Sequence, residues 1–245
     1  MARSETIQVR AVDHMVPHVS TVPANKGERV QLYVREKFAG EAAGKPVVLM
    51  VHGGFSPATL AFDVEREDYS WMSYLAGVGF DVFAMDMTGY GKSSRPKMDD
   101  PCNVRPAEQK ALIPKTLPAA CKPTYPYELV NSQSESDDID RVVLRARTRT
   151  YWGWNAETAK KLKQPTLILV GEYDQLTASN KELYEDLGSA NKVFVAISCA
   201  SHFVLWEKQH GPLHRASGEW LAKGTFNGAA RGMFRIDPQG RFVAN

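Results

Sequence analysis

The sequence lacks the features that define several common classes of protein. It has three cysteines in 245 residues, too few for the disulfide framework of a small secreted domain. No apolar run is long enough to span a bilayer, and the first residues contain no apolar stretch of signal-peptide length. We therefore expect a cytoplasmic protein that has no membrane partner.

The sequence also has little excess of charge of either sign. Thirty basic and 28 acidic residues leave a formal net charge of +2. Nucleic-acid binding usually needs a clearly basic surface, so we expect no nucleic-acid partner. Residues 89–93 look like the end of a phosphate-binding loop, but that motif needs glycine where Asp86 stands. We assign no metal and no cofactor.

The three cysteines leave two questions open. Cys102 and Cys121 both lie within the proline-rich segment 96–126 and could pair in an oxidising compartment. That segment could cap the mouth of a pocket or be a mobile excursion. Cys199 lies among small residues near His202, and there we expect a buried, unreactive thiol.

Apolar runs alternate with amphipathic stretches along the chain, which is 43% apolar and long enough to bury a sizeable core. The patterns predict strands at 31–36, 47–51, 80–85, 166–170 and 193–197. They predict helices at 69–78, 139–143, 156–162, 181–187 and 210–221. Strands that alternate with helices predict an α/β fold, a mainly parallel sheet with helices on both faces. We expect a single domain over residues 1–245.

Polar and glycine residues follow three of the predicted strands, where the carboxyl ends of parallel strands place catalytic loops. His52-Gly53-Gly54 follows one strand, Asp174 the second and His202 the third. A histidine can take a proton from a nucleophile while a carboxylate orients it, and glycines let backbone N–H groups approach a substrate oxygen. Each residue also has a plainer interpretation: Asp174 as a turn or helix cap, and His202 as a loop histidine bonded to a carbonyl.

Taken together, these segments resemble the α/β-hydrolase family. The resemblance rests on residues 47–54, on 86–96 with their Gly89-Tyr90-Gly91-Lys92-Ser93-Ser94 loop, on 169–174 and on 201–203. It implies the fold of that family, with His202 as the catalytic base and Asp174 as its orienter. It also implies an oxyanion hole formed by the Gly53-Gly54 loop, joined by Phe55. The activity implied is ester hydrolysis of a small-molecule substrate.

One part of the family pattern is missing. No G-x-S-x-G motif occurs anywhere in the chain, so the nucleophile is unknown. By the resemblance, the nucleophile strand and the next strand are absent at a seam near Val143 and Leu144, between an N-terminal half (1–143) and a C-terminal half (144–245). Three interpretations stay open: an ester hydrolase by descent, a non-catalytic binding or assembly protein, or an internal-deletion form of a longer enzyme.

The missing strands have a structural consequence. In the family the strands at 47–51 and 166–170 are separated by the two absent strands. Here they must pair directly, leave their edges exposed, or recruit a partner chain. Exposed edges would favour a homo-oligomer.

Overall fold

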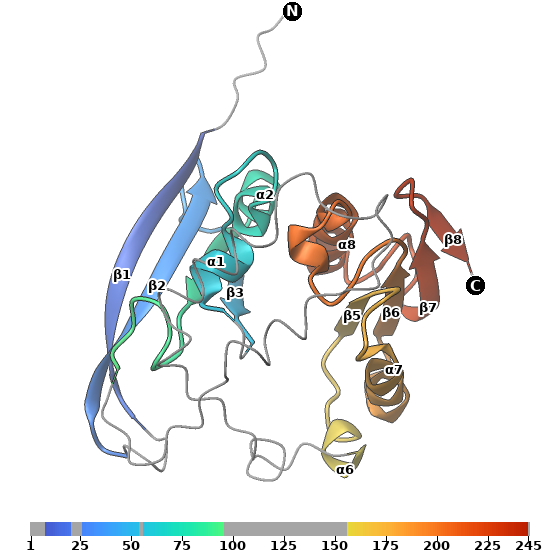
Figure 1. Cartoon of the computed structure of the whole chain (residues 1–245), viewed down its shortest axis with the longest axis horizontal. Helices are drawn as coiled ribbons and strands as arrows, with labels where there is room; N and C mark the ends of the chain where they lie inside the picture. The colour runs from blue at the N-terminus through green and yellow to red at the C-terminus, as the bar shows by residue number, and fades with distance from the viewer. Residues whose placement is uncertain (1–7, 21–25, 54–55, 96–155, 245) are drawn as a thin grey trace, which may run out of the picture. The chain divides into compact units, whose positions relative to one another are not determined.

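The computed structural model describes residues 8–20, 26–53, 56–95 and 156–244. The chain divides into two compact units, and among the described residues strands β1 to β4 belong to the first unit and elements α6 to β8 to the second (Figure 1). The single-domain organisation stays a prediction. No helix in the described ranges is both long enough and apolar enough to cross a membrane.

The first unit contains a four-stranded sheet in the order β1-β2-β4-β3. Its strands are β1 (Val9–Val19), β2 (Arg29–Ala39), β3 (Val47–Val51) and β4 (Asp81–Met85). The pairs β1–β2 and β2–β4 are antiparallel, and β3–β4 is parallel, with Val47 opposite Asp81 and Val51 opposite Met85. Because β3 and β4 are parallel, the loops that follow them leave the same edge of the sheet.

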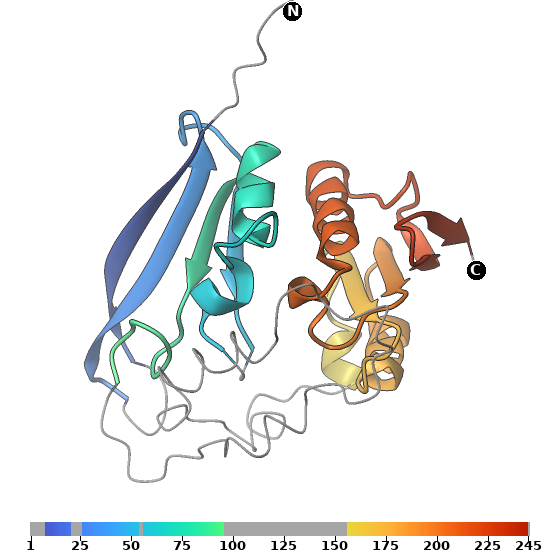
Figure 2. The same ribbon diagram turned by 45° about the horizontal axis from the view of Figure 1, so that its top comes forward.

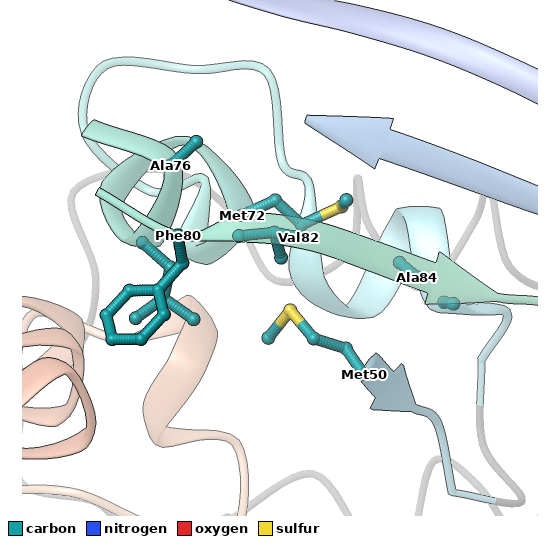
Figure 3. Packing of buried hydrophobic residues seen from close by; sticks show 8 residues of the cluster. Met50, Met72, Ala76, Phe80, Val82 and Ala84 are labelled. Atoms are coloured by element: carbon teal, nitrogen blue, oxygen red, sulfur yellow. The ribbon is translucent and has the colours of Figure 1, made fainter. Parts of the chain in front are cut away.

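Helices α1 (Ala58–Phe62) and α2 (Trp71–Gly77) cover one face of this sheet. Figure 3 shows Met50 of β3 directed toward Met72 of α2 and toward Val82 of β4, and Met72 and Val82 are fully buried. Burial of each such side chain contributes roughly 1.5–3 kcal/mol. Side chains alternate along a strand, so Val47, Leu49 and Val51 lie on the other face, where they are exposed.

The second unit contains a four-stranded sheet in the order β5-β6-β7-β8. Its strands are β5 (Thr166–Gly171), β6 (Lys192–Ile197), β7 (Arg231–Ile236) and β8 (Phe242–Ala244). The first three are mutually parallel, and β8 is antiparallel to β7. Its helical elements are α6 (Ala156–Ala159), α7 (Thr177–Asp186), the 3₁₀ turn η4 (Val204–Trp206) and α8 (His210–Lys223).

Helices cover both faces of the second sheet. Tyr184 of α7 packs against Val170 and Phe194 on one face. Val193 and Val195, which alternate with Phe194 along β6, are fully buried on the other face. Figures 1 and 2 show α8 on the opposite side of this sheet from α7. The second unit therefore has the helix–sheet–helix layering expected for an α/β fold.

All five predicted strands are present, and so are four of the predicted helices, with shifted ends. Two strands that the sequence patterns did not predict, β7 and β8, follow α8. The predicted helix at 139–143, the proline-rich segment 96–126, the seam at 143–144 and the pairing of Cys102 with Cys121 lie outside the described residues. The prediction of a buried, unreactive thiol at Cys199 is wrong, because this residue is half-buried and disulfide-bonded.

Strands β3 and β5 each stand at the end of a sheet. Among the described residues of its own unit, each has a strand neighbour on one side only.

Candidate active site

Asp174 and His202 are brought together at the carboxyl ends of two adjacent parallel strands. Asp174 lies three residues after β5, and His202 lies five residues after β6. The distance between His202 Nδ1 and Asp174 Oδ2 is 3.1 Å. A carboxylate can only accept, so Nδ1 carries the proton and donates it, and the lone pair of Nε2 is left to act as a base.

The two loops that carry this pair are bonded directly to each other. The backbone N–H of Tyr173 donates to the carbonyl of Ala200 over 2.8 Å. A Cβ atom at Gly171 would lie 2.2 Å from the carbonyl oxygen of Ser201, so only glycine allows so close an approach. Gly171 therefore does more than end a strand, because it sets the separation between the acid loop and the base loop.

Asp174 uses both carboxylate oxygens. Oδ1 accepts the backbone N–H of Leu176 over 2.8 Å, and Oδ2 accepts from His202. Burial alone would raise the pKa of Asp174, but the hydrogen bonds from His202 and Leu176 outweigh burial and lower it. The side chain is 7% exposed, so these hydrogen bonds hold the carboxylate ionised in a largely enclosed position.

The side chain of His202 is 40% exposed, so its imidazole is accessible to solvent. The hydrogen bond to Asp174 is the main cause that raises the pKa of His202, and burial opposes it. Within the described part of the chain, Nε2 of His202 makes no hydrogen bond. The plainer interpretation of His202, a loop histidine bonded to a backbone carbonyl, is therefore not what the structure shows.

Two glutamates that the sequence analysis did not single out support this loop pair. Glu172 accepts from Arg235 over 3.2 Å and from the backbone N–H of Cys199 over 3.1 Å. Glu207, fully buried, accepts from both the backbone and the hydroxyl of Ser201. Glu172 lies within the segment 169–174 that carries the family resemblance, but no local signal predicts its contact with Cys199 or the contact of Glu207 with Ser201.

The predicted oxyanion loop belongs to the first unit, and only Gly53 of it is described. His52 is buried, and its Nε2 accepts the backbone N–H of Met87 over 3.0 Å while Nδ1 donates to the carbonyl of Gly53 over 2.6 Å. Burial lowers the pKa of His52. The neutral imidazole of His52 thus connects the end of β3 to the end of β4 through its hydrogen bonds. Gly54 and Phe55 lie outside the described residues.

The glycine loop after β4 is not a phosphate cradle. Its backbone N–H groups are used inside the protein: those of Gly89, Tyr90, Ser93 and Ser94 donate to backbone carbonyls, and that of Lys92 donates to Asp86. Asp86 is fully buried and also accepts the N–H of Ala58 over 2.7 Å. Gly91 has a φ of 46°, and a Cβ there would lie 1.9 Å from Asp86 Oδ2. The carboxylate of Asp86 thus lies against the backbone of this loop and takes the N–H of Lys92 for itself.

The comparisons with known proteins address the fold. The model of the α/β-hydrolase fold family matches residues 46–104, which hold β3, α1, α2, β4 and the glycine loop. The chain has the α/β-hydrolase fold. This α/β-hydrolase-fold protein has no match among the curated proteins with which it was compared. No cluster of potential metal ligands occurs in the ranges that the structure describes.

Several solved structures share the fold at low sequence identity. A haloalkane dehalogenase from Bradyrhizobium elkani aligns with a TM-score of 0.56 and 12% identity, over 87% of this chain and 98% of that one. A thermophilic esterase from Thermogutta terrifontis aligns with a TM-score of 0.55 and 16% identity, over 86% and 98%. The 2-hydroxy-6-oxo-6-phenylhexa-2,4-dienoate hydrolase from Rhodococcus sp. strain RHA1 gives 0.54 and 16%, over 84% and 98%. These similarities concern the fold.

Proposed function

We propose that this chain is by descent an ester-type hydrolase of a small-molecule substrate and that it retains the acid–base pair of that machinery. The hydrogen bond between Asp174 and His202, at the carboxyl ends of adjacent parallel strands, is the observation that carries the proposal. It has the geometry that a triad needs between its orienting acid and its base. An esterase is among the proteins of similar fold, and that supports the reaction class without defining the substrate.

The inherited chemistry would be acyl transfer. His202 Nε2 takes the proton from a serine hydroxyl as its oxygen bonds to the acyl carbon, and returns that proton to the leaving alcohol as the acyl–oxygen bond breaks. Water then repeats the sequence and releases the acid. Asp174 stabilises the imidazolium at each step, and N–H groups of the Gly53, Gly54 and Phe55 loop would hold the oxyanion.

The nucleophile is the unassigned part of this scheme, since no G-x-S-x-G occurs in the sequence. That absence, with β3 and β5 each at the end of its sheet among the described residues, favours a second candidate function: a binding or assembly protein without turnover. The same absence fits an internal-deletion form of a longer hydrolase. A genomic reading frame with extra codons between Val143 and Leu144 that encode G-x-S-x-G would establish the deletion, and contiguous codons would exclude a splicing or annotation error.

The hydrolase proposal is tested with activated short-chain esters such as p-nitrophenyl butyrate. We expect slow hydrolysis that falls to the background rate in His202→Ala and is retained in His18→Ala, the same change at an exposed histidine of β1. A fluorophosphonate probe followed by peptide mapping identifies the serine. If no serine is labelled in the folded protein and His202→Ala matches the wild type, the chain is not an acyl hydrolase and the binding function is favoured.

A further inference from the structure

The histidine loop is closed by a buried carboxylate that takes no part in the chemistry described above. Glu207 follows η4, and its side chain is fully buried. Its Oε2 accepts the backbone N–H of Ser201 over 2.7 Å, and its Oε1 accepts the hydroxyl of Ser201. The carboxylate thus accepts hydrogen bonds from both the backbone N–H and the hydroxyl of Ser201, the residue that precedes His202.

The hydrogen-bonded chain that begins at Glu207 and Ser201 extends to Phe203, the residue that follows His202. The hydroxyl oxygen of Ser201 accepts the backbone N–H of Phe203 over 3.2 Å. Phe203 in turn stacks on Trp206 with ring centroids 5.2 Å apart and meets the His202 ring edge-on at 5.3 Å. Both peptide neighbours of the histidine are therefore fixed from inside the protein, while its imidazole is left at the surface.

Glu207 is itself held firmly. Its carbonyl accepts the backbone N–H of His210 over 3.1 Å and the ring Nδ1 of His210 over 2.8 Å, at the start of α8. The position of the carboxylate is therefore coupled to the first turn of a fourteen-residue helix. Burying an ionised carboxylate is costly unless hydrogen bonds compensate, so an apolar side chain would serve better if packing were the only requirement.

We propose that Glu207 is a positioning residue for His202: its carboxylate binds Ser201 and thereby fixes the direction of the imidazole, and it supplies a second negative charge that acts on His202. The charge acts in the same sense as that of Asp174, since both carboxylates raise the pKa of His202. In the described part of the chain these are the two charged groups that act on this histidine. The inference rests on the proposed function only for its consequence in turnover, because orientation and protonation of His202 are measurable without a substrate.

The test uses the full chain labelled with 13C at histidine. The pH titration of His202 gives its pKa, and 13C relaxation of the Cε1–H bond gives the mobility of the ring. For Glu207→Gln we expect a His202 pKa below that of the wild type and a more mobile ring. Glu182→Gln, the same change at an exposed site of α7, should leave both unchanged.

Ser201→Ala keeps the buried charge and removes only the hydroxyl that donates to it, so it serves if Glu207→Gln does not fold. We expect a more mobile His202 ring in this variant, with a pKa closer to the wild-type value than that of Glu207→Gln. Thermal unfolding identifies variants that are merely less stable. Lower stability with an unchanged pKa and mobility in the folded variants would overturn the proposal. If ester hydrolysis is absent while the NMR effects appear, the proposed function fails and the positioning role stands.

Discussion

At the scale of single residues, Asp174 shows that one carboxylate can hold a backbone turn and orient a histidine at the same time. Oδ1 caps the backbone turn that leads into α7 at Leu176, while Oδ2 holds His202. Because the turn bond fixes the carboxylate, the oxygen that faces the histidine is placed in advance. The two interpretations that the sequence left open for this residue therefore describe the same side chain.

Asp174→Asn tests the electrostatic half of this arrangement. The carboxylate stabilises the imidazolium and raises the pKa of His202, so its loss should lower that pKa toward the ordinary value of about 6.5. The basic form of His202 would then persist to lower pH, but an amide can favour the wrong tautomer, and any ester hydrolysis should fall by about 10³-fold or more. An NMR titration of His202 and a pH–rate profile measure the two effects.

The matched control for that experiment is Asp186→Asn, at the C-terminal end of α7 and away from His202. It should leave both the titration and the rate unchanged. A His202 pKa in Asp174→Asn equal to or above the wild-type value would contradict the assigned direction.

The pair of Asp174 and His202 should be ionic, with both partners charged, only between the lowered pKa of Asp174 and the raised pKa of His202. Its ionic contribution to stability should be lost outside that pH range.

At the scale of elements, α7 is closed at its C-terminal end by a lysine from the next strand. Lys192 is buried at the start of β6, and its Nζ donates to three backbone carbonyls, those of Tyr184, Glu185 and Leu187, over 2.6–3.0 Å. The last carbonyls of a helix lack partners within the helix and carry partial negative charge. A positive charge there satisfies the carbonyls and also joins α7 to the sheet.

Lys192→Met should remove this cap while keeping most of the apolar stem. We expect a loss of about 2 kcal/mol in the free energy of unfolding, since three carbonyls lose a charged donor. Lys181→Met, at an exposed site of α7, is the control and should change stability by less than about 0.5 kcal/mol. Urea unfolding measures both variants, and equal midpoints for the two would show that the cap contributes nothing.

Some elements carried enough local information to be predicted, and others did not. β3 was predicted from its continuous apolar run, and β4 from a similar one. β1 was missed because most of its residues are exposed on both faces, which removes the alternation that marks a half-buried strand. β7 was missed because Arg231, Gly232 and Arg235 interrupt its apolar pattern, and it is specified by pairing with β6.

The candidate site also has contacts that the sequence could predict and contacts that it could not. The meeting of Asp174 and His202 could be predicted because parallel strands place their following loops at one edge, and this rule needs no knowledge of side-chain contacts. The support from Glu207 and Glu172 could not, because a single glutamate has no local signal that it will accept from a buried backbone N–H. Such contacts depend on tertiary packing, which one sequence does not reveal.

At the scale of the whole molecule, the two sheets each end in a strand that the family would place in the interior of one larger sheet. On β3, alternate apolar side chains are largely exposed: Val47 is 66%, Leu49 59% and Val51 51% accessible. β3 is also the end strand of its sheet, and an end strand with unpaired backbone groups and exposed apolar side chains is the usual template for pairing with another chain. We propose that a second copy of this chain covers the β3 edge, which would make the protein a homo-oligomer.

Leu49→Lys tests that proposal, because a lysine at an edge strand opposes the approach of another strand. Sedimentation velocity of the wild type should show association that increases with concentration, and the substitution should weaken it by about tenfold, since a buried charge without a partner costs more than about 1.4 kcal/mol. Val78→Lys places the same charge at another exposed apolar site after α2, where it should leave association unchanged. Equal weakening by both variants would point to nonspecific charge repulsion. A wild type that stays monomeric at every concentration would exclude pairing of two copies through β3.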